Sequence, residues 1–136
     1  MKTNLLLLII GLVLSSCDIL VVEPLYDERD QVTGSYRIEE YSQTYNESIR
    51  FNIYIRKSGY GYNSRDVIIE NFYNAGVDVR AEISSGKIFI PRQVVNGYEI
   101  EGVGSLYLNE IQFNYKVRDT YTNRIPDFCE ATAWVN

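Results

Sequence analysis

The segment Ile49–Arg56, IRFNIYIR, places an apolar residue at every second position. Two later segments, Val77–Ile83 (VDVRAEI) and Ile111–Arg118 (IQFNYKVR), repeat this alternation. Successive side chains of a β-strand point to opposite faces of a sheet, so a period of two gathers the apolar side chains on one face. The three segments therefore predict strands that bury one face and expose the other to water.

Five shorter runs extend this pattern to about eight strands. They cover residues 36–41, 66–72, 87–90, 98–107 and 128–135. Turn-forming residues separate the runs, as in Asn74-Ala75-Gly76, Ser84-Ser85-Gly86 and Asn96-Gly97. No segment that follows the first 16 residues shows a sustained helical period. The sequence therefore predicts an all-β fold.

Eight short antiparallel strands with short connections can close into an up-and-down barrel or pack as a Greek-key sandwich. Closure removes the two exposed edges of the sheet, so we expect an antiparallel eight-stranded up-and-down barrel over residues 34–136. A barrel of eight strands is just wide enough to be filled by its own side chains or to hold one small ligand. Both interiors are consistent with the strand pattern.

The first 16 residues predict a lipoprotein signal peptide that is cleaved. Lys2 precedes an apolar run over residues 5–14, which is the pattern of a secretory signal. The following Leu14-Ser15-Ser16-Cys17 resembles the bacterial lipobox, and this resemblance implies cleavage before Cys17, a thioether to diacylglycerol on its sulfur and acylation of its new amino group. Several acyl chains hold a protein stably on a bilayer, whereas one chain is marginal.

We therefore expect Cys17 to be the lipid attachment site and residues 17–33 to be a linker between the lipid and the barrel. The resulting protein is anchored in the cell envelope, and the outer membrane is the expected membrane. The protein is expected to bind the membrane through the lipid on Cys17.

Composition narrows the function classes. The chain of 136 residues contains no histidine, which excludes serine–histidine triads and removes the commonest metal ligand. Thirteen basic residues against eighteen acidic ones leave a formal net charge of -5, so a nucleic-acid partner is not expected. We expect no catalytic residue, no metal and no cofactor.

We expect five glutamates on the outside of the barrel and the second cysteine inside it. Five glutamates could in principle form a carboxylate pair for glycoside hydrolysis, but we expect them on the solvated exterior of the barrel. They are Glu39, Glu40, Glu70, Glu99 and Glu101. Cys129 alternates with polar residues and shares a face with Ala131, Ala133 and Val135, so it is expected to be a buried, inert side chain.

Four segments of the chain resemble the middle of small lipocalin-like (calycin-type) lipoproteins of Bacteroidota. They are residues 67–77 (VIIENFYNAGV), 79–83 (VRAEI), 86–93 (GKIFIPRQ) and 98–105 (YEIEGVGS), and their order and spacing carry the resemblance. The resemblance implies a calycin-type barrel on a lipid tether.

Two functions follow from these expectations. In the first, the non-catalytic barrel binds a small apolar or glycan ligand, and Tyr60 and Tyr62 contact it. These tyrosines lie among glycines in the longest inter-strand loop, where aromatic rings can stack on a sugar or close over an apolar group. In the second, the barrel is filled, and its outer surface binds or inhibits another envelope protein.

Overall fold

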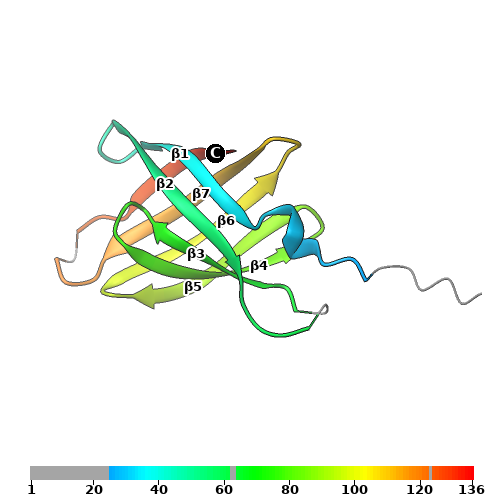
Figure 1. Ribbon diagram of the computed structural model, residues 1–136. Helices are drawn as coiled ribbons and strands as arrows, with labels where there is room; N and C mark the ends of the chain where they lie inside the picture. The colour runs from blue at the N-terminus through cyan, green and yellow to red at the C-terminus, as the bar shows by residue number, and fades with distance from the viewer. Residues whose placement is uncertain (1–24, 62–63, 123) are drawn as a thin grey trace, which may run out of the picture.

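The computed structural model describes residues 25–61, 64–122 and 124–136. It is an all-β protein with one short 3-10 helix (Figure 1), and its strands form a closed antiparallel barrel in chain order. The elements are η1 (Glu28–Gln31), β1 (Gly34–Ser42), β2 (Glu47–Lys57), β3 (Asp66–Phe72), β4 (Val77–Ser84), β5 (Lys87–Val95), β6 (Tyr98–Leu106), β7 (Glu110–Asp119) and β8 (Asp127–Val135). Pairing of β1 with β8 closes the ring, which confirms the predicted up-and-down barrel.

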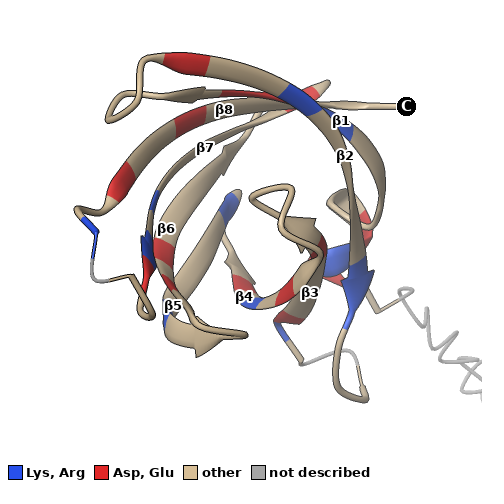
Figure 2. Ribbon diagram, turned by 90° about the vertical axis from the view of Figure 1, so that its left-hand side faces the viewer, with Lys and Arg blue, Asp and Glu red and all other residues tan. Residues whose placement is uncertain are grey.

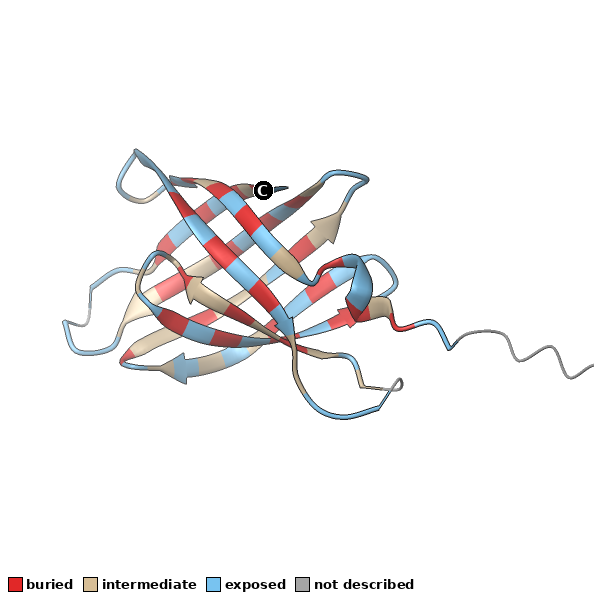
Figure 3. Ribbon diagram, viewed as in Figure 1, coloured by how far each residue is buried: buried red, intermediate tan, exposed pale blue. Residues whose placement is uncertain are grey.

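The apolar face of each strand turns inward. In β4 the side chains alternate strictly between buried and exposed, and Figure 3 shows the same banding along β1 and β2. The interior is filled mainly by isoleucine, valine and phenylalanine side chains, such as Ile55, Val79 and Phe113. The single buried face explains why the period of two in the sequence predicts the strands so directly.

Strand β5 is longer than its apolar run. The run predicts a strand over residues 87–90, but the strand continues through Pro91 to Val95. The register of β5 against β6 shifts between Ile90 and Gln93. Proline has no N–H to donate to the ladder, and a bulge of this kind accommodates it.

Gly102 and Gly104 allow neighbouring side chains to pack against the backbone of β6. A Cβ atom at Gly102 would lie 2.4 Å from Cβ of Tyr115, and one at Gly104 would lie 2.8 Å from the ring of Phe113. Both aromatic side chains are buried inside the barrel. Glycine at these two positions therefore serves close packing of side chains against the backbone.

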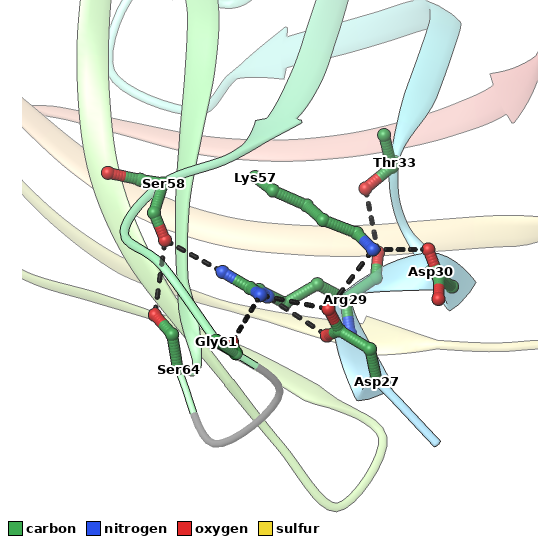
Figure 4. A network of polar contacts seen from close by, with 8 residues as sticks. All are labelled: Asp27, Arg29, Asp30, Thr33, Lys57, Ser58, Gly61 and Ser64. Carbon is green, nitrogen blue, oxygen red and sulfur yellow. Dashed lines mark hydrogen bonds and ion pairs between the residues drawn. The ribbon is translucent and has the colours of Figure 1, made fainter. Parts of the chain in front are cut away.

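One end of the barrel, which we call the base, is formed by η1, the β2–β3 loop and the β4–β5 and β6–β7 turns. The buried guanidinium of Arg29 joins η1 to the β2–β3 loop (Figure 4): it donates to Asp27 Oδ2 at 2.8 Å and to the carbonyl oxygens of Ser58 and Gly61 at 2.8 and 2.9 Å. The N–H of Ser85 in the β4–β5 turn donates to Glu28 of η1 at 3.2 Å. Lys57 adds an ion pair to Asp27 at 3.0 Å. Residues 27–33, which we expected to belong to the linker, thus pack against the barrel.

The opposite end carries the β1–β2, β3–β4, β5–β6 and β7–β8 connections, and Figure 2 looks toward it. Residue 25, the first that the structure describes, enters at the base. The chain therefore approaches the barrel from the side away from these four connections. In the described part of the chain, no helix is long and apolar enough to cross a bilayer.

Candidate functional site

The end opposite the base contains two adjoining hollows, which we together call the cup. Their volumes are about 210 Å³ and about 90 Å³. Tyr45, Tyr73 and Asp127 line both hollows. The larger one is completed by Tyr98, Val117, Asp119, Arg124 and Ile125, and the smaller one by Glu40, Ser42, Glu47 and Ile49.

Strand alternation brings polar side chains into the cup. Glu40 and Ser42 have the same parity along β1 as the core residues Tyr36 and Ile38, and all four are buried. Asp127, the first residue of β8, is 4% exposed and likewise shares the inward face of its strand. The inward face of the paired strands β1 and β8 is thus apolar in the middle of the barrel and polar at this end.

Asp127 is held by two hydroxyl groups. Ser42 Oγ donates to its Oδ1 at 2.5 Å, and the Tyr73 hydroxyl donates to its Oδ2 at 2.7 Å. The Tyr73 ring packs edge-on against the ring of Tyr98, with 6.2 Å between centroids. Burial, together with the hydrogen bond to Asp127, raises the pKa of the Tyr73 hydroxyl, which therefore stays protonated and keeps its role as a donor.

Glu40 is buried without a partner. Its side chain is 2% exposed, and its Oε2 atom forms no hydrogen bond among the described residues. Burial raises the pKa of this carboxyl group to about 7, and the nearby charge of Asp127 adds to the shift. Near neutral pH the group therefore exists in both protonation states, and it can donate or accept a hydrogen bond.

The expectation that all five glutamates lie on the solvated exterior is wrong for Glu40. It holds for Glu39, Glu70 and Glu101, whereas Glu99 faces outward but is largely covered, with its side chain 14% exposed. All four form ion pairs with basic residues of the outer surface. The pairs are Glu39–Arg50, Glu70–Arg56, Glu99–Arg92, Glu99–Arg118 and Glu101–Lys116. Glu40 and Glu39 are neighbours in β1, and successive side chains of a strand point to opposite faces. Glu39 therefore points outward and Glu40 points into the barrel.

Cys129 lies next to the cup on the inward face of β8. Its free thiol is buried, as expected. The neighbouring Ala131 and Ala133 are also buried, whereas Val135 is exposed at the end of the strand. Burial raises the pKa of the thiol, and the charges of Glu40 and Asp127 raise it further. The thiol therefore remains protonated and unreactive at neutral pH.

The structure places Tyr60, one of the two predicted ligand-binding tyrosines, away from the cup. Tyr60 is fully exposed in the β2–β3 loop, which belongs to the base. Tyr62 and the predicted lipid attachment site Cys17 lie outside the described residues. The aromatic residues of the cup are instead Tyr45, Tyr73 and Tyr98. Sequence reasoning missed Tyr45 and Tyr73 because turn residues carry no periodicity that indicates which way a side chain points. Tyr98 is the first residue of β6, and only the fold brings its ring into contact with Tyr73.

A shallow hollow of about 490 Å³ lies on the outer face of the sheet, over β1, β2, β7 and β8. Tyr41 and Trp134 border it, and each is 40% exposed. Thr132, Gln112 and Asn114 supply polar groups between them. This surface is more open than the cup, and its polar lining is typical of a solvated sheet face.

Within the described residues, no three cysteine, aspartate or glutamate side chains converge in a way that could hold a metal ion.

Comparison with models of protein families gives no match to this chain. Comparison with curated proteins also gives no match.

Proposed function

We propose that this protein is a lipid-anchored, non-catalytic binding protein of the cell envelope, and that its barrel takes a small apolar or glycan ligand into the cup. The observation that carries this proposal is the combination of three tyrosines with the buried, unpartnered carboxyl of Glu40 around the two adjoining hollows of the cup. Buried polar groups normally have hydrogen-bond partners, and an unpartnered one costs about 1 to 3 kcal/mol. A ligand that supplies the missing partner offsets this cost.

The size of the cup limits what it can hold. Sites for drug-sized ligands measure roughly 300 to 1,000 Å³, whereas the two hollows measure about 210 and 90 Å³. Apolar side chains fill the barrel below them, so the interior of the barrel is not the ligand site and the proposal concerns the cup at its end alone. The ligand therefore places a single ring or a short chain end in the cup and leaves the rest of its structure outside.

Tyrosine suits such a site because its ring offers apolar contact while its hydroxyl forms hydrogen bonds. The hydroxyl of Tyr73 is already fixed by Asp127, and the ring of Tyr98 is fixed by packing against Tyr73. The cup walls are thus largely preformed, which lowers the entropic cost of binding.

The proposed anchor fits the position of the cup. The chain enters the barrel at the base, so a lipid on Cys17 tethers the molecule from the end opposite the cup. Seven residues separate Cys17 from Leu25, and an extended chain of that length reaches roughly 25 Å. With this tether the cup lies at the end of the barrel that is farther from the anchor.

Mass spectrometry under non-denaturing conditions tests the binding proposal. The protein is purified from its own envelopes, and Tyr45→Ser is compared with Tyr107→Ser; Tyr45 is 45% exposed in the cup and Tyr107 is 58% exposed at the base. We expect a small bound molecule on the wild type and on Tyr107→Ser, with much lower occupancy on Tyr45→Ser. Equal occupancy in both variants, or none on the wild type, would contradict the proposal.

Replacement of Cys17 by serine tests the anchor. We expect the wild type to incorporate a radiolabelled fatty acid and to partition with membranes, and Cys17→Ser to lose both properties. Continued membrane association of the variant would show that the lipobox does not explain the localisation.

The outer hollow at Tyr41 and Trp134 favours a second candidate, in which the sheet face binds another envelope protein. Partly exposed aromatic residues are enriched at such interfaces. Photo-crosslinking from position 41 in intact envelopes tests it: one discrete adduct supports the candidate, and unreacted protein alone argues against it.

A further inference from the structure

The charges around the cup are strongly unequal. Four of its lining residues are acidic, namely Glu40, Glu47, Asp119 and Asp127, and one is basic, Arg124. Two of the acids, Glu40 and Asp127, are at least 95% buried. Within the described part of the chain, neither carboxylate has a lysine or arginine nitrogen within 4.0 Å.

Buried charges in proteins are usually paired, because removal of an ion from water is costly. Asp27, at the base, follows this rule with Arg29 and Lys57 as partners. Asp127 accepts two hydroxyl hydrogen bonds but has no cation beside it. Glu40 has an oxygen with no partner at all, and this oxygen belongs to a residue that lines the smaller hollow.

From this geometry we infer that the group bound in the cup is a small organic cation, an amine or quaternary ammonium that lies between the carboxylates of Glu40 and Asp127 and against the rings of Tyr45 and Tyr73, which line the same hollow. This inference rests on the proposed function, because it concerns the same cup and gives the apolar or glycan ligand of that proposal a positively charged group. Aromatic rings attract cations within about 6 Å of the ring centroid. An ammonium group thus satisfies the acids and the tyrosines together, whereas a neutral group satisfies the tyrosines alone.

Cation binding is coupled to the protonation of Glu40. The titratable groups around it are Asp127 and Cys129 on β8, Glu47 on β2 and Tyr73 in the β3–β4 turn; of these, Cys129 and Tyr73 remain protonated at neutral pH. A cation between Glu40 and Asp127 favours the ionised form of Glu40, so binding releases a proton. The affinity for a permanent cation therefore rises as the pH increases from 5 to 8.

Isothermal titration calorimetry of the mature, lipidated protein in nanodiscs tests the inference with defined probes. Choline and benzylamine are the cationic probes. Their neutral counterparts are 3,3-dimethylbutanol and benzyl alcohol, and glucose represents a neutral sugar. We expect the cations to bind at least roughly tenfold more tightly than their counterparts, because the attraction between a positive charge and a buried carboxylate exceeds the roughly 1.4 kcal/mol that a tenfold change in affinity requires.

Two conservative variants locate the effect. Glu40→Gln removes the buried charge, and Glu82→Gln removes an exposed charge from the outer face of β4. We expect Glu40→Gln to weaken choline binding roughly tenfold or more and to abolish its rise with pH, and Glu82→Gln to leave both unchanged. Circular dichroism of each variant verifies that the barrel is intact.

The outcomes separate the inference from the proposed function. Neutral probes that bind as tightly as the cations, with binding lost in Tyr45→Ser, would overturn the ammonium inference and leave the cup as a ligand site. Choline binding that Glu40→Gln does not change would also overturn it, because the cation would then lie elsewhere. The absence of binding by any probe would count against both.

Discussion

Glu40, with its buried carboxyl group, is the central residue of the cup. Glu39 and Glu40 are identical in chemistry and adjacent in sequence, yet the first pairs with Arg50 in solvent and the second has no partner inside the barrel. The parity of Tyr36, Ile38, Glu40 and Ser42 predicts the inward position, since each is two residues from the next. A pattern search that looks for apolar residues alone overlooks such a position because the residue there is charged.

Glu40 makes stability depend on pH. The pKa of its carboxyl is about 7 in the folded protein, against an ordinary 4.5. The folded state therefore binds more protons than the unfolded state between these values, and the free energy of unfolding falls as the pH rises through this range. We expect Glu40→Gln to remove this decrease and to stabilise the protein at pH 8 by at most about 3 kcal/mol.

Urea denaturation of the two variants at pH 5, 7 and 8 measures this effect. Glu82→Gln, on the outer face, serves as the control and should behave as the wild type does. The same loss of stability with rising pH in Glu40→Gln and wild type would show that another group is responsible.

Gly102 provides a second test at the residue scale. A methyl group there would overlap with Tyr115 and with the carbonyl oxygen of Asn114, 2.7 Å away. Because that neighbour is backbone, the overlap cannot be relieved by a change of rotamer. We expect Gly102→Ala to lower the free energy of unfolding by about 1 to 3 kcal/mol, measured by thermal and urea denaturation. Val103→Ala, an outward-facing change beside it, should have a smaller effect.

At the scale of elements, alternating sequences predict strands well and irregular segments poorly. The runs at Ile49–Arg56 and Val77–Ile83 lie within β2 and β4, because one face of each strand is buried. The 3-10 helix η1 has only four residues, too few to show a helical period. Its acidic residues suggest a solvated linker, and only the tertiary partners of Arg29 show that the segment packs against the barrel.

The base therefore depends on Arg29. We expect Arg29→Ala to lower the urea midpoint and to increase hydrogen exchange in residues 27–33 and 58–61, because Asp27 and two carbonyl groups lose a donor. Arg50→Ala removes a solvent-exposed ion pair and should change little. If both variants show the same exchange at the base, Arg29 does not hold it.

Acid should loosen the same element. The guanidinium of Arg29 holds the pKa of the Asp27 carboxyl well below its usual range, and Lys57 adds to the effect. The contribution of this pair to stability is therefore complete above the ordinary pKa of about 3.8 and is lost as the pH falls below it. Protection from hydrogen exchange at the base, measured relative to the rate of an unstructured peptide at the same pH, should accordingly decrease below about pH 3 in the wild type and depend less on acid in Arg29→Ala.

At the scale of the whole molecule, the number of strands and their short connections predict a closed barrel. The cup could not be predicted in the same way. Its position depends on which end η1 closes and on how β8 returns to β1, so residues as distant in sequence as Glu40, Tyr73 and Asp127 become neighbours only after closure. The length of the loop at Tyr60 predicted a ligand site there, but this loop lies at the base, opposite the cup.

The central claim is that ligands bind in the cup, at the end opposite the proposed tether. Nuclear magnetic resonance of the lipidated protein in nanodiscs, with ¹³C-labelled tyrosine rings, tests it most directly. The small-molecule fraction extracted from the protein's own envelopes serves as the titrant. The account predicts that the ring signals of Tyr45, Tyr73 and Tyr98 shift together while those of Tyr60 and Tyr107 stay in place. Shifts confined to Tyr60 and Tyr107, or no shift in the three cup tyrosines, would contradict it.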